Sequence, residues 1–264
     1  MQKQDLEQFH AWFDGYVSTF YGDDEYVNTN LKLKEEHSRL VCEQARYLAD
    51  ELNLSENQRL LAETIAIFHD VGRFEQFVKY KTYNDPRSIN HNELAIEVLE
   101  KYKVLDVLDA RDAEIVKTAI KLHNIKELPA NLDDRISLQA RLIRDADKID
   151  IYRVVIEDEE GFKLHGENYL REMEFPKKPH CTPEIVEAVM TQQRIGYSRL
   201  RTQNDFRLLQ LSWVFDVNFI PTLQRIKDTG LLDRILAIMP QIPELAKAGK
   251  YVLDYVDRRI NENK

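Results

Sequence analysis

Cysteine is scarce in this sequence, and so are the residues that interrupt helices. Only two cysteines occur, Cys42 and Cys181, and they do not form a Cys-x-x-Cys pair. This excludes a thiolate zinc site and argues against a disulfide framework. Glycine and proline each number only 8 in 264 residues, whereas helix-forming residues are abundant. The composition favours an all-α fold, because a sheet-rich chain needs more turn residues between its strands.

Acidic residues outnumber basic ones, 46 to 37, and long apolar runs are absent from the sequence. The formal net charge is −9, so we expect neither a nucleic-acid polymer nor a membrane surface as a partner. A few local cations could still hold a small anionic substrate. No apolar run approaches the roughly 20 residues that span a bilayer. The first residues also lack the basic-then-apolar order of a signal peptide, so a cytoplasmic protein is expected.

Apolar residues recur at helical spacing along most of the chain. The helices expected from this spacing cover residues 3–20, 31–53, 111–124 and 134–157. Two more are expected to begin at the capping residues Ser55 and Asn90. The first of these runs into the doublet His69–Asp70, and Gly72 is placed to end it. A charged loop is expected over residues 158–182, followed by further helices.

Four of the seven histidines lie on the apolar side of their own helices. They are His37, His69, His91 and His123. His37, for example, lies four residues before Val41 and eight before Ala45. A single inward histidine usually bonds a neighbouring carbonyl group in the core. Four of them on successive helices, together with an inward Asp70, are not explained by packing. Neutral imidazoles that converge with carboxylates are typical ligands of a borderline divalent metal.

The segment RDADKID offers further carboxylates for such a site. Asp147 lies four residues from both Ile143 and Ile151, so it is the better candidate to face the core. Asp145 is the alternative ligand. Asp150 is expected on a solvated face of the helix.

The ordered set of His37, the doublet His69–Asp70 and Asp147 resembles the signature of the HD superfamily of metal-dependent phosphohydrolases. The resemblance covers residues 31–155, and HDVGRF and RDADKID are its clearest local matches. It implies a helical bundle with the metal at its centre. The chain lacks the GYP stretch of cyclic-dinucleotide phosphodiesterases and the acidic pair of alarmone hydrolases. It looks most like the bacterial HD-domain hydrolases that have no assigned substrate.

The resemblance also implies a ligand set. Carried over by position, His37, His69, Asp70 and Asp147 would bind one metal ion. In members with two ions, the additional ligands match His91 and His123, and Asp70 would bridge the ions. One or two divalent ions are therefore expected, and Mn, Fe, Mg, Zn and Ni are not distinguished.

The activity implied by the resemblance is hydrolysis of a small, nucleotide-like phosphoester by water that the metal activates. Asp70 would take part as the bridging ligand. Arg73 and Lys148 would contact the substrate phosphate. Many family members have a lysine near the position of Arg73, and in similar enzymes the residue at the position of Lys148 contacts phosphate. Either can instead be an ordinary surface cation. The general acid and the oligomeric state are left open.

A second function fits the same ligands. A minority of HD-fold proteins, which resemble myo-inositol oxygenase, hold two irons with this six-residue set and activate O₂. A binding protein without catalysis is a third possibility, which the intact ligand set disfavours. For the domain organisation, we expect a single all-α domain over residues 1–264. Residues 31–155 would be its metal-binding HD core and residues 160–264 a helical extension.

Overall fold

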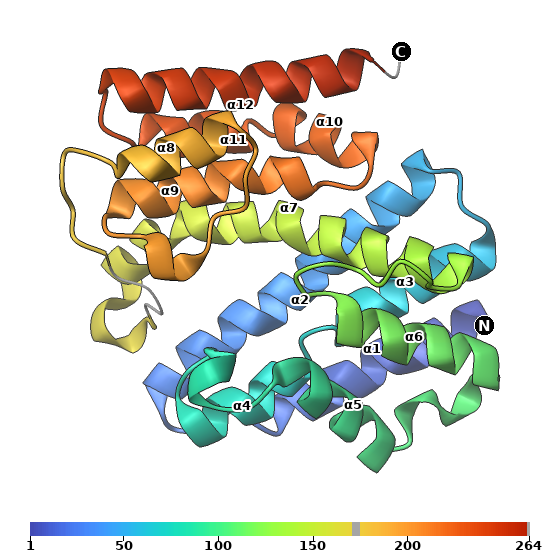
Figure 1. Ribbon diagram of the computed structural model, residues 1–264. Coiled ribbons are helices and arrows are strands. Elements are labelled where there is room, and N and C mark those ends of the chain that lie inside the picture. Colours follow the sequence, from blue (N-terminus) through green and yellow to red (C-terminus); the bar gives the residue numbers. More distant parts are fainter. Residues whose placement is uncertain (171–174, 263–264) are drawn as a thin grey trace. The chain divides into compact units, whose positions relative to one another are not determined.

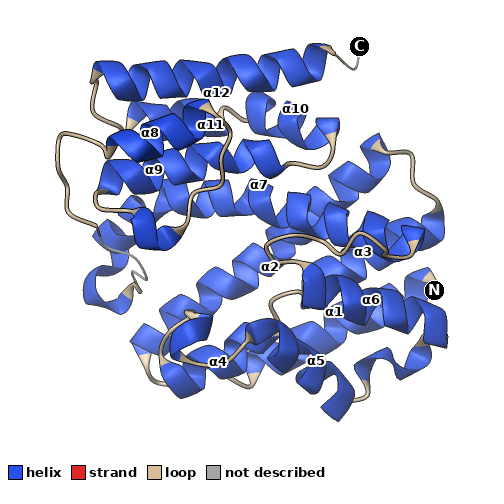
Figure 2. Cartoon of the chain, viewed as in Figure 1, coloured by secondary structure: helices blue, strands red, loops and turns tan. Residues whose placement is uncertain are grey.

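The computed structural model describes residues 1–170 and 175–262, and every regular element in these residues is a helix (Figures 1 and 2). The all-α prediction is confirmed. The chain divides into two compact units, Met1–Glu172 and Met173–Lys264. That all 264 residues form one domain stays a prediction. Among the described residues, no helix combines the length and hydropathy needed to cross a membrane.

The first unit is built around α3, whose residues from Leu60 to Phe68 are all buried. Its helices are α1 (Lys3–Ser18), α2 (Glu25–Glu51), α3 (Glu56–Phe68), α4 (Gly72–Tyr80), α5 (His91–Lys101), α6 (Ala110–Leu122) and α7 (Asp134–His165). The α3 helix packs against α1, α2, α6 and α7, and α4 packs against α5. The C-terminal ends of α3 and α6 and the N-terminal end of α5 lie close together in this arrangement.

Capping side chains fix where several of these helices begin. The Ser55 side chain accepts a hydrogen bond from the amide of Gln58, as the predicted capping box requires. Asn90 caps α5 by accepting from two amides of its first turn. Both predicted starts are therefore confirmed. The α2 helix begins earlier than residue 31, because Asp24 caps it through the amide of Val27.

The charged loop expected after residue 157 is partly wrong. The α7 helix continues without a break to His165, and a short 3-10 turn, Gly166–Asn168, follows it. Residues 171–174 of the expected loop lie outside the described residues. A run of acidic residues resembles a solvated loop in sequence, yet here it lies on a continuous helix.

The role predicted for Gly72 is also wrong. The α3 helix already ends at Phe68, and Gly72 is the first residue of α4. A Cβ atom on Gly72 would lie 2.5 Å from the carbonyl oxygen of His91 and 2.7 Å from the amide nitrogen of Ala95. Glycine is required here because the start of α4 contacts the backbone of α5 directly.

The second unit contains α8 (Pro183–Met190), α9 (Gln203–Ser212), α10 (Ile220–Asp228), α11 (Leu231–Ala237) and α12 (Pro243–Asn261). The α12 helix packs against α8, α9 and α10. The buried carboxylate of Asp205 ties the start of α9 to the segment before α8. It accepts hydrogen bonds from the amides of Thr182, Arg201 and Thr202 at 2.7, 2.9 and 3.0 Å, and from the Thr182 hydroxyl at 2.7 Å.

The Asp205→Ala variant is expected to unfold at lower urea concentration than the wild type. Removing the carboxylate leaves three amide donors, including the buried one of Thr202, without this acceptor, which costs up to about 3 kcal/mol of unfolding free energy at neutral pH. Burial raises the pKa of Asp205, but hydrogen bonds from Thr182, Arg201 and Thr202 outweigh it and hold the pKa below the ordinary 3.8.

The pH dependence of this effect has a definite sign. The stabilisation by the Asp205 carboxylate is fully present above its unfolded pKa and is lost as the pH falls through its folded pKa. Urea denaturation at pH 7 and pH 3 should therefore give a larger difference between the two proteins at pH 7. If wild type and Asp205→Ala differed in stability by the same amount at pH 7 and at pH 3, the stabilising role of the ionised Asp205 carboxylate would be contradicted.

Candidate metal centre

Six side chains from five helices of the first unit and their adjoining turns form three overlapping groups that could hold a metal ion. The groups are His37–His69–Asp70, His69–His123–Asp147 and Asp70–His91–His123. His37 and Asp147 project from the middle of α2 and α7, whereas His69 and His123 are the C-cap residues of α3 and α6. His91 is the first residue of α5, and Asp70 lies in the turn between α3 and α4. The structure thus brings together every residue predicted as a metal ligand.

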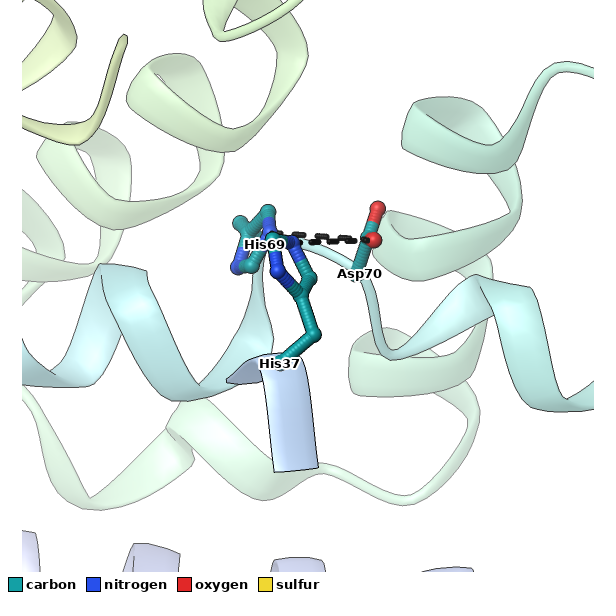
Figure 3. Close-up of side chains that lie close together, drawn as sticks. All are labelled: His37, His69 and Asp70. Carbon is teal, nitrogen blue, oxygen red and sulfur yellow. Dashed lines mark hydrogen bonds and ion pairs between the residues drawn. The ribbon is translucent and has the colours of Figure 1, made fainter. Parts of the chain in front are cut away.

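The first part of the centre joins α2, α3 and α7 through His37, His69 and Asp147, with Asp70 beside them. Figure 3 shows His37, His69 and Asp70 close together. The Nε2 atoms of His37 and His69 are 3.3 Å apart. The Oδ2 atom of Asp70 lies 3.7 Å from each of these nitrogens. On the other side, Asp147 Oδ1 lies 3.1 Å from His37 Nε2 and 3.8 Å from His69 Nε2. Two imidazole nitrogens and two carboxylates therefore surround one small volume.

The second part joins α5 and α6 to the same Asp70. The Nε2 atoms of His91 and His123 are also 3.3 Å apart. Asp70 Oδ1 lies 3.4 Å from His91 Nε2. The two oxygens of Asp70 thus face different histidine pairs. One buried carboxylate therefore lies between the two histidine pairs.

Each of the four histidines is oriented by a hydrogen bond from its Nδ1 atom to an oxygen. The acceptors are Asp150 Oδ2 for His37 at 2.6 Å, the Ala66 carbonyl for His69 at 2.7 Å, Asp85 Oδ2 for His91 at 2.7 Å and the Ile120 carbonyl for His123 at 2.8 Å. Carbonyls and carboxylates accept only, so each Nδ1 carries a proton. Partners of this kind fix the tautomer in protein metal sites.

These tautomers test whether a metal fits the centre. A neutral imidazole with a proton on Nδ1 presents a lone pair at Nε2. His91 and His123 therefore point two lone pairs at each other across 3.3 Å in a buried site. Such an arrangement is unfavourable unless a cation lies beside both nitrogens. The donor set of imidazoles and carboxylates suits a borderline divalent ion, so the residues fit the metal.

The protonation states follow from burial and from the neighbouring charges. Burial lowers the pKa of His69, His91 and His123, and that of His123 falls to about 3. Burial and Lys34 also lower the pKa of His37, but its bonds with Asp147 and Asp150 outweigh them and raise it to about 9. Three of the histidines are therefore neutral at pH 7, as metal ligands must be.

The two carboxylates of the centre are ionised. Burial raises the pKa of Asp70, but Lys34 and the surrounding histidines outweigh burial and hold it well below its ordinary value. Burial also raises the pKa of Asp147, but the hydrogen bond with His37 outweighs burial and lowers the pKa of this carboxyl group below its ordinary value. Both groups are therefore charged acceptors at neutral pH.

Asp150 is not on a solvated face, so the prediction for it is wrong. Its side chain is only 2% exposed and accepts a hydrogen bond from His37 Nδ1. Arg153 also holds it through two bonds, from Nε to Oδ1 at 2.8 Å and from Nη2 to Oδ2 at 3.0 Å. Asp145 is buried too, but only Asp147 belongs to the groups that could hold a metal.

The Asp150→Ala variant is expected to bind Mn²⁺ about 10- to 100-fold more weakly than the wild type. The loss arises because the His37 ring would no longer be held in its tautomer and orientation. Isothermal titration with Mn²⁺ measures it. Asp112→Ala is a matched control, because Asp112 is an equally buried carboxylate. Its contacts in the described part of the chain are with Asn57, Arg135 and the Met1 ammonium group, and it does not belong to the candidate metal groups. Equal metal affinity in Asp150→Ala and wild type would show that Asp150 does not support the centre.

Arg73 lies beside the centre, but its guanidinium group is already engaged by protein atoms. Its Nε atom is 3.3 Å from Asp70 Oδ1, and its Nη1 atom is 3.0 Å from Asp85 Oδ1. Nη1 also donates to Gln76 and to the carbonyl oxygen of Tyr83. Arg73 thus links Asp70 to Asp85, the partner of His91. Contact with substrate phosphate stays a prediction for Arg73, as it does for the half-buried Lys148 on α7.

Lys34 was not singled out from the sequence, although it contacts the centre directly. Its Nζ atom lies 2.8 Å from Asp70 Oδ2. Lys34 precedes His37 by three residues on α2, a spacing that places both side chains on the same side of a helix. That spacing could have identified it.

A cavity of about 290 Å³ opens next to the metal centre. His37 and Lys34 line it at the side of the centre, and Tyr83, Arg153 and Tyr169 contribute to its walls. Its volume is near the lower end of the range for small-molecule sites. The centre is therefore adjacent to a space that a small ligand could occupy.

Comparison with known proteins identifies the segment that carries the centre. The family model described as HD domain matches residues 35–152, which include all the candidate ligands. No curated protein and no solved structure matches the chain. The match agrees with a helical unit whose buried His and Asp groups can hold a divalent metal.

Proposed function

Residues 35–152 belong to the HD-domain superfamily, and on this premise we propose that the protein is a metal-dependent phosphohydrolase acting on a small, nucleotide-like phosphoester. One observation carries the proposal. The Nε2 atoms of the four inward histidines converge with the carboxylates of Asp70 and Asp147, next to a cavity that a small substrate can enter. A centre of this composition is adapted to hold divalent ions.

We propose that two ions bind. As the family resemblance implies, His37, His69, Asp70 and Asp147 would hold one ion. Asp70, His91 and His123 would hold the other. Asp70 would belong to both sites, because its two oxygens face different histidine pairs. The predominance of imidazole favours Mn, Fe, Ni or Zn over Mg, which prefers oxygen ligands.

The residues around the centre orient it and set its charge. A divalent ion supplies a nucleophile from water at neutral pH and polarises a phosphoryl oxygen. The Nδ1 hydrogen bonds hold the four imidazoles so that their ligand atoms point inward. Asp85 and Asp150, in turn held by Arg73 and Arg153, fix two of those rings. Lys34, Arg73 and Lys148 would add positive charge where a substrate phosphate has to bind.

Elemental analysis of the purified protein, combined with a panel of small phosphoesters, tests this function. We expect bound divalent ions and a hydrolytic activity that is lost on chelation and restored by Mn²⁺. The alternative is an oxygenase with a di-iron centre. A mixed-valent di-iron protein that consumes O₂ and hydrolyses no phosphoester in Mn²⁺ or Mg²⁺ would overturn the proposal.

A further inference from the structure

Lys34 occupies a position between the metal centre and the cavity. Its Nζ atom contacts Asp70 Oδ2 at 2.8 Å, and its side chain is 22% exposed and lines the cavity together with His37. The ammonium group also lies 5.3 Å from the centre of the Tyr83 ring. Building on the proposed function, we propose that Lys34 moves from Asp70 to the substrate phosphate when metal ions bind.

The first argument is that Lys34 and a metal ion share one oxygen. Asp70 Oδ2, which Lys34 contacts, is also the oxygen that faces the Nε2 atoms of His37 and His69. A divalent ion placed there would lie close to the Lys34 ammonium. Two positive groups on one carboxylate oxygen repel each other strongly in a buried site. The binding of metal therefore weakens the contact between Lys34 and Asp70.

The second argument is that Lys34 is better able to move than the two arginines beside the centre. Arg73 is 14% exposed and is bound to Asp70, Asp85 and Gln76. Arg153 is held by two bonds to Asp150 and by Glu157. Lys34 instead carries its charge on a flexible chain of four carbons, with three donors that rotate freely. Because Lys34 both contacts Asp70 and lines the cavity, rotation of its side chain would move the ammonium group from Asp70 to a ligand in the cavity.

The composition of the cavity indicates what kind of substrate Lys34 would meet. Beyond His37 and Lys34, its walls include the rings of Tyr83 and Tyr169 and apolar side chains such as Leu33, Val154 and Leu170. Arg153 and the acidic residues Glu36, Glu157 and Asp158 also line it. The phosphate would bind at the Lys34 end, and a partly apolar group would lie against these walls. The volume of about 290 Å³ is near the lower end of the range for small-molecule sites, which favours a small phosphoester.

Titrations of Lys34→Met with Mn²⁺ and with inorganic phosphate separate the roles that Lys34 can have. The variant is expected to bind Mn²⁺ as tightly as the wild type or more tightly, because a competing cation is removed. In saturating Mn²⁺, the affinity of the variant for inorganic phosphate is expected to fall at least about 10-fold, because it loses a hydrogen bond between two charged groups. Wild type without Mn²⁺ should bind phosphate weakly, since Lys34 then stays on Asp70.

Lys32→Met is the matched control. Lys32 lies on the same helix, but its side chain is 69% exposed and lies near Glu36. It should resemble the wild type in both titrations. Unchanged phosphate affinity in Lys34→Met would overturn the inference, as would a large loss of Mn²⁺ affinity, which would make Lys34 a structural support of the centre. If the wild type itself bound no Mn²⁺, the proposed function would fail independently of Lys34.

Discussion

The Asp70→Ala variant is expected to bind Mn²⁺ at least about 100-fold more weakly than the wild type and to lose phosphoester hydrolysis. Removing a group that merely orients a ligand already costs up to about 100-fold in metal affinity. Asp70 contributes more, because its oxygens face both histidine pairs. Its loss would also leave Lys34 without the carboxylate that it contacts and remove one of the two carboxylates that pair with Arg73.

Isothermal titration with Mn²⁺ and circular dichroism together measure this effect. The helical signal should stay close to that of the wild type, since Asp70 lies in a turn between α3 and α4. Asp14→Ala is a suitable control, because Asp14 is an exposed acidic residue on α1 that pairs only with Arg39 among the ion pairs of the described residues. An Asp70→Ala protein that retained two Mn²⁺ ions at wild-type affinity would be incompatible with a bridging carboxylate.

Gly72→Ala is expected to destabilise the protein by about 3 kcal/mol and to weaken metal binding at the same time. The new Cβ atom would lie 2.5 Å from the His91 carbonyl oxygen, which belongs to the backbone and cannot simply turn aside. The start of α5 would have to move, and His91 with it. Urea denaturation and Mn²⁺ titration measure the two consequences.

The chain offers a matched control for this substitution. Gly15 lies within α1, and a Cβ atom there would have nothing within 4 Å. Gly15→Ala should therefore leave the protein equally stable or stabilise it by about 0.5 to 1 kcal/mol, since alanine favours helix more than glycine does. If Gly72→Ala were as stable as Gly15→Ala, the close contact between α4 and α5 would not constrain residue 72.

The inward histidines were predictable because the direction of a helical side chain is set locally. His37, His69, His91 and His123 each share the apolar side of their own helices, and all four are buried. Periodicity alone does not show that they meet. The order of His37, the doublet and Asp147 supplied that information by resemblance to a family, and the structure brings the groups together.

The residues that were mispredicted depend on contacts between distant segments. Asp150 is polar and follows other charged residues, so its sequence context suggests solvent. It is buried because His37, 113 residues away, needs an acceptor for its Nδ1 proton. Gly72 follows a helix and fits the pattern of a helix end, but its real constraint is the α5 backbone. Neither partner is visible in the local sequence.

Anomalous diffraction from crystals grown with Mn²⁺ tests the existence of the metal centre most directly. Two peaks are expected in each chain. One should lie among His37, His69, Asp70 and Asp147, and the other among Asp70, His91 and His123. The absence of any peak among these side chains, at Mn²⁺ concentrations well above those used in the titrations, would contradict the assignment of this site as a metal centre.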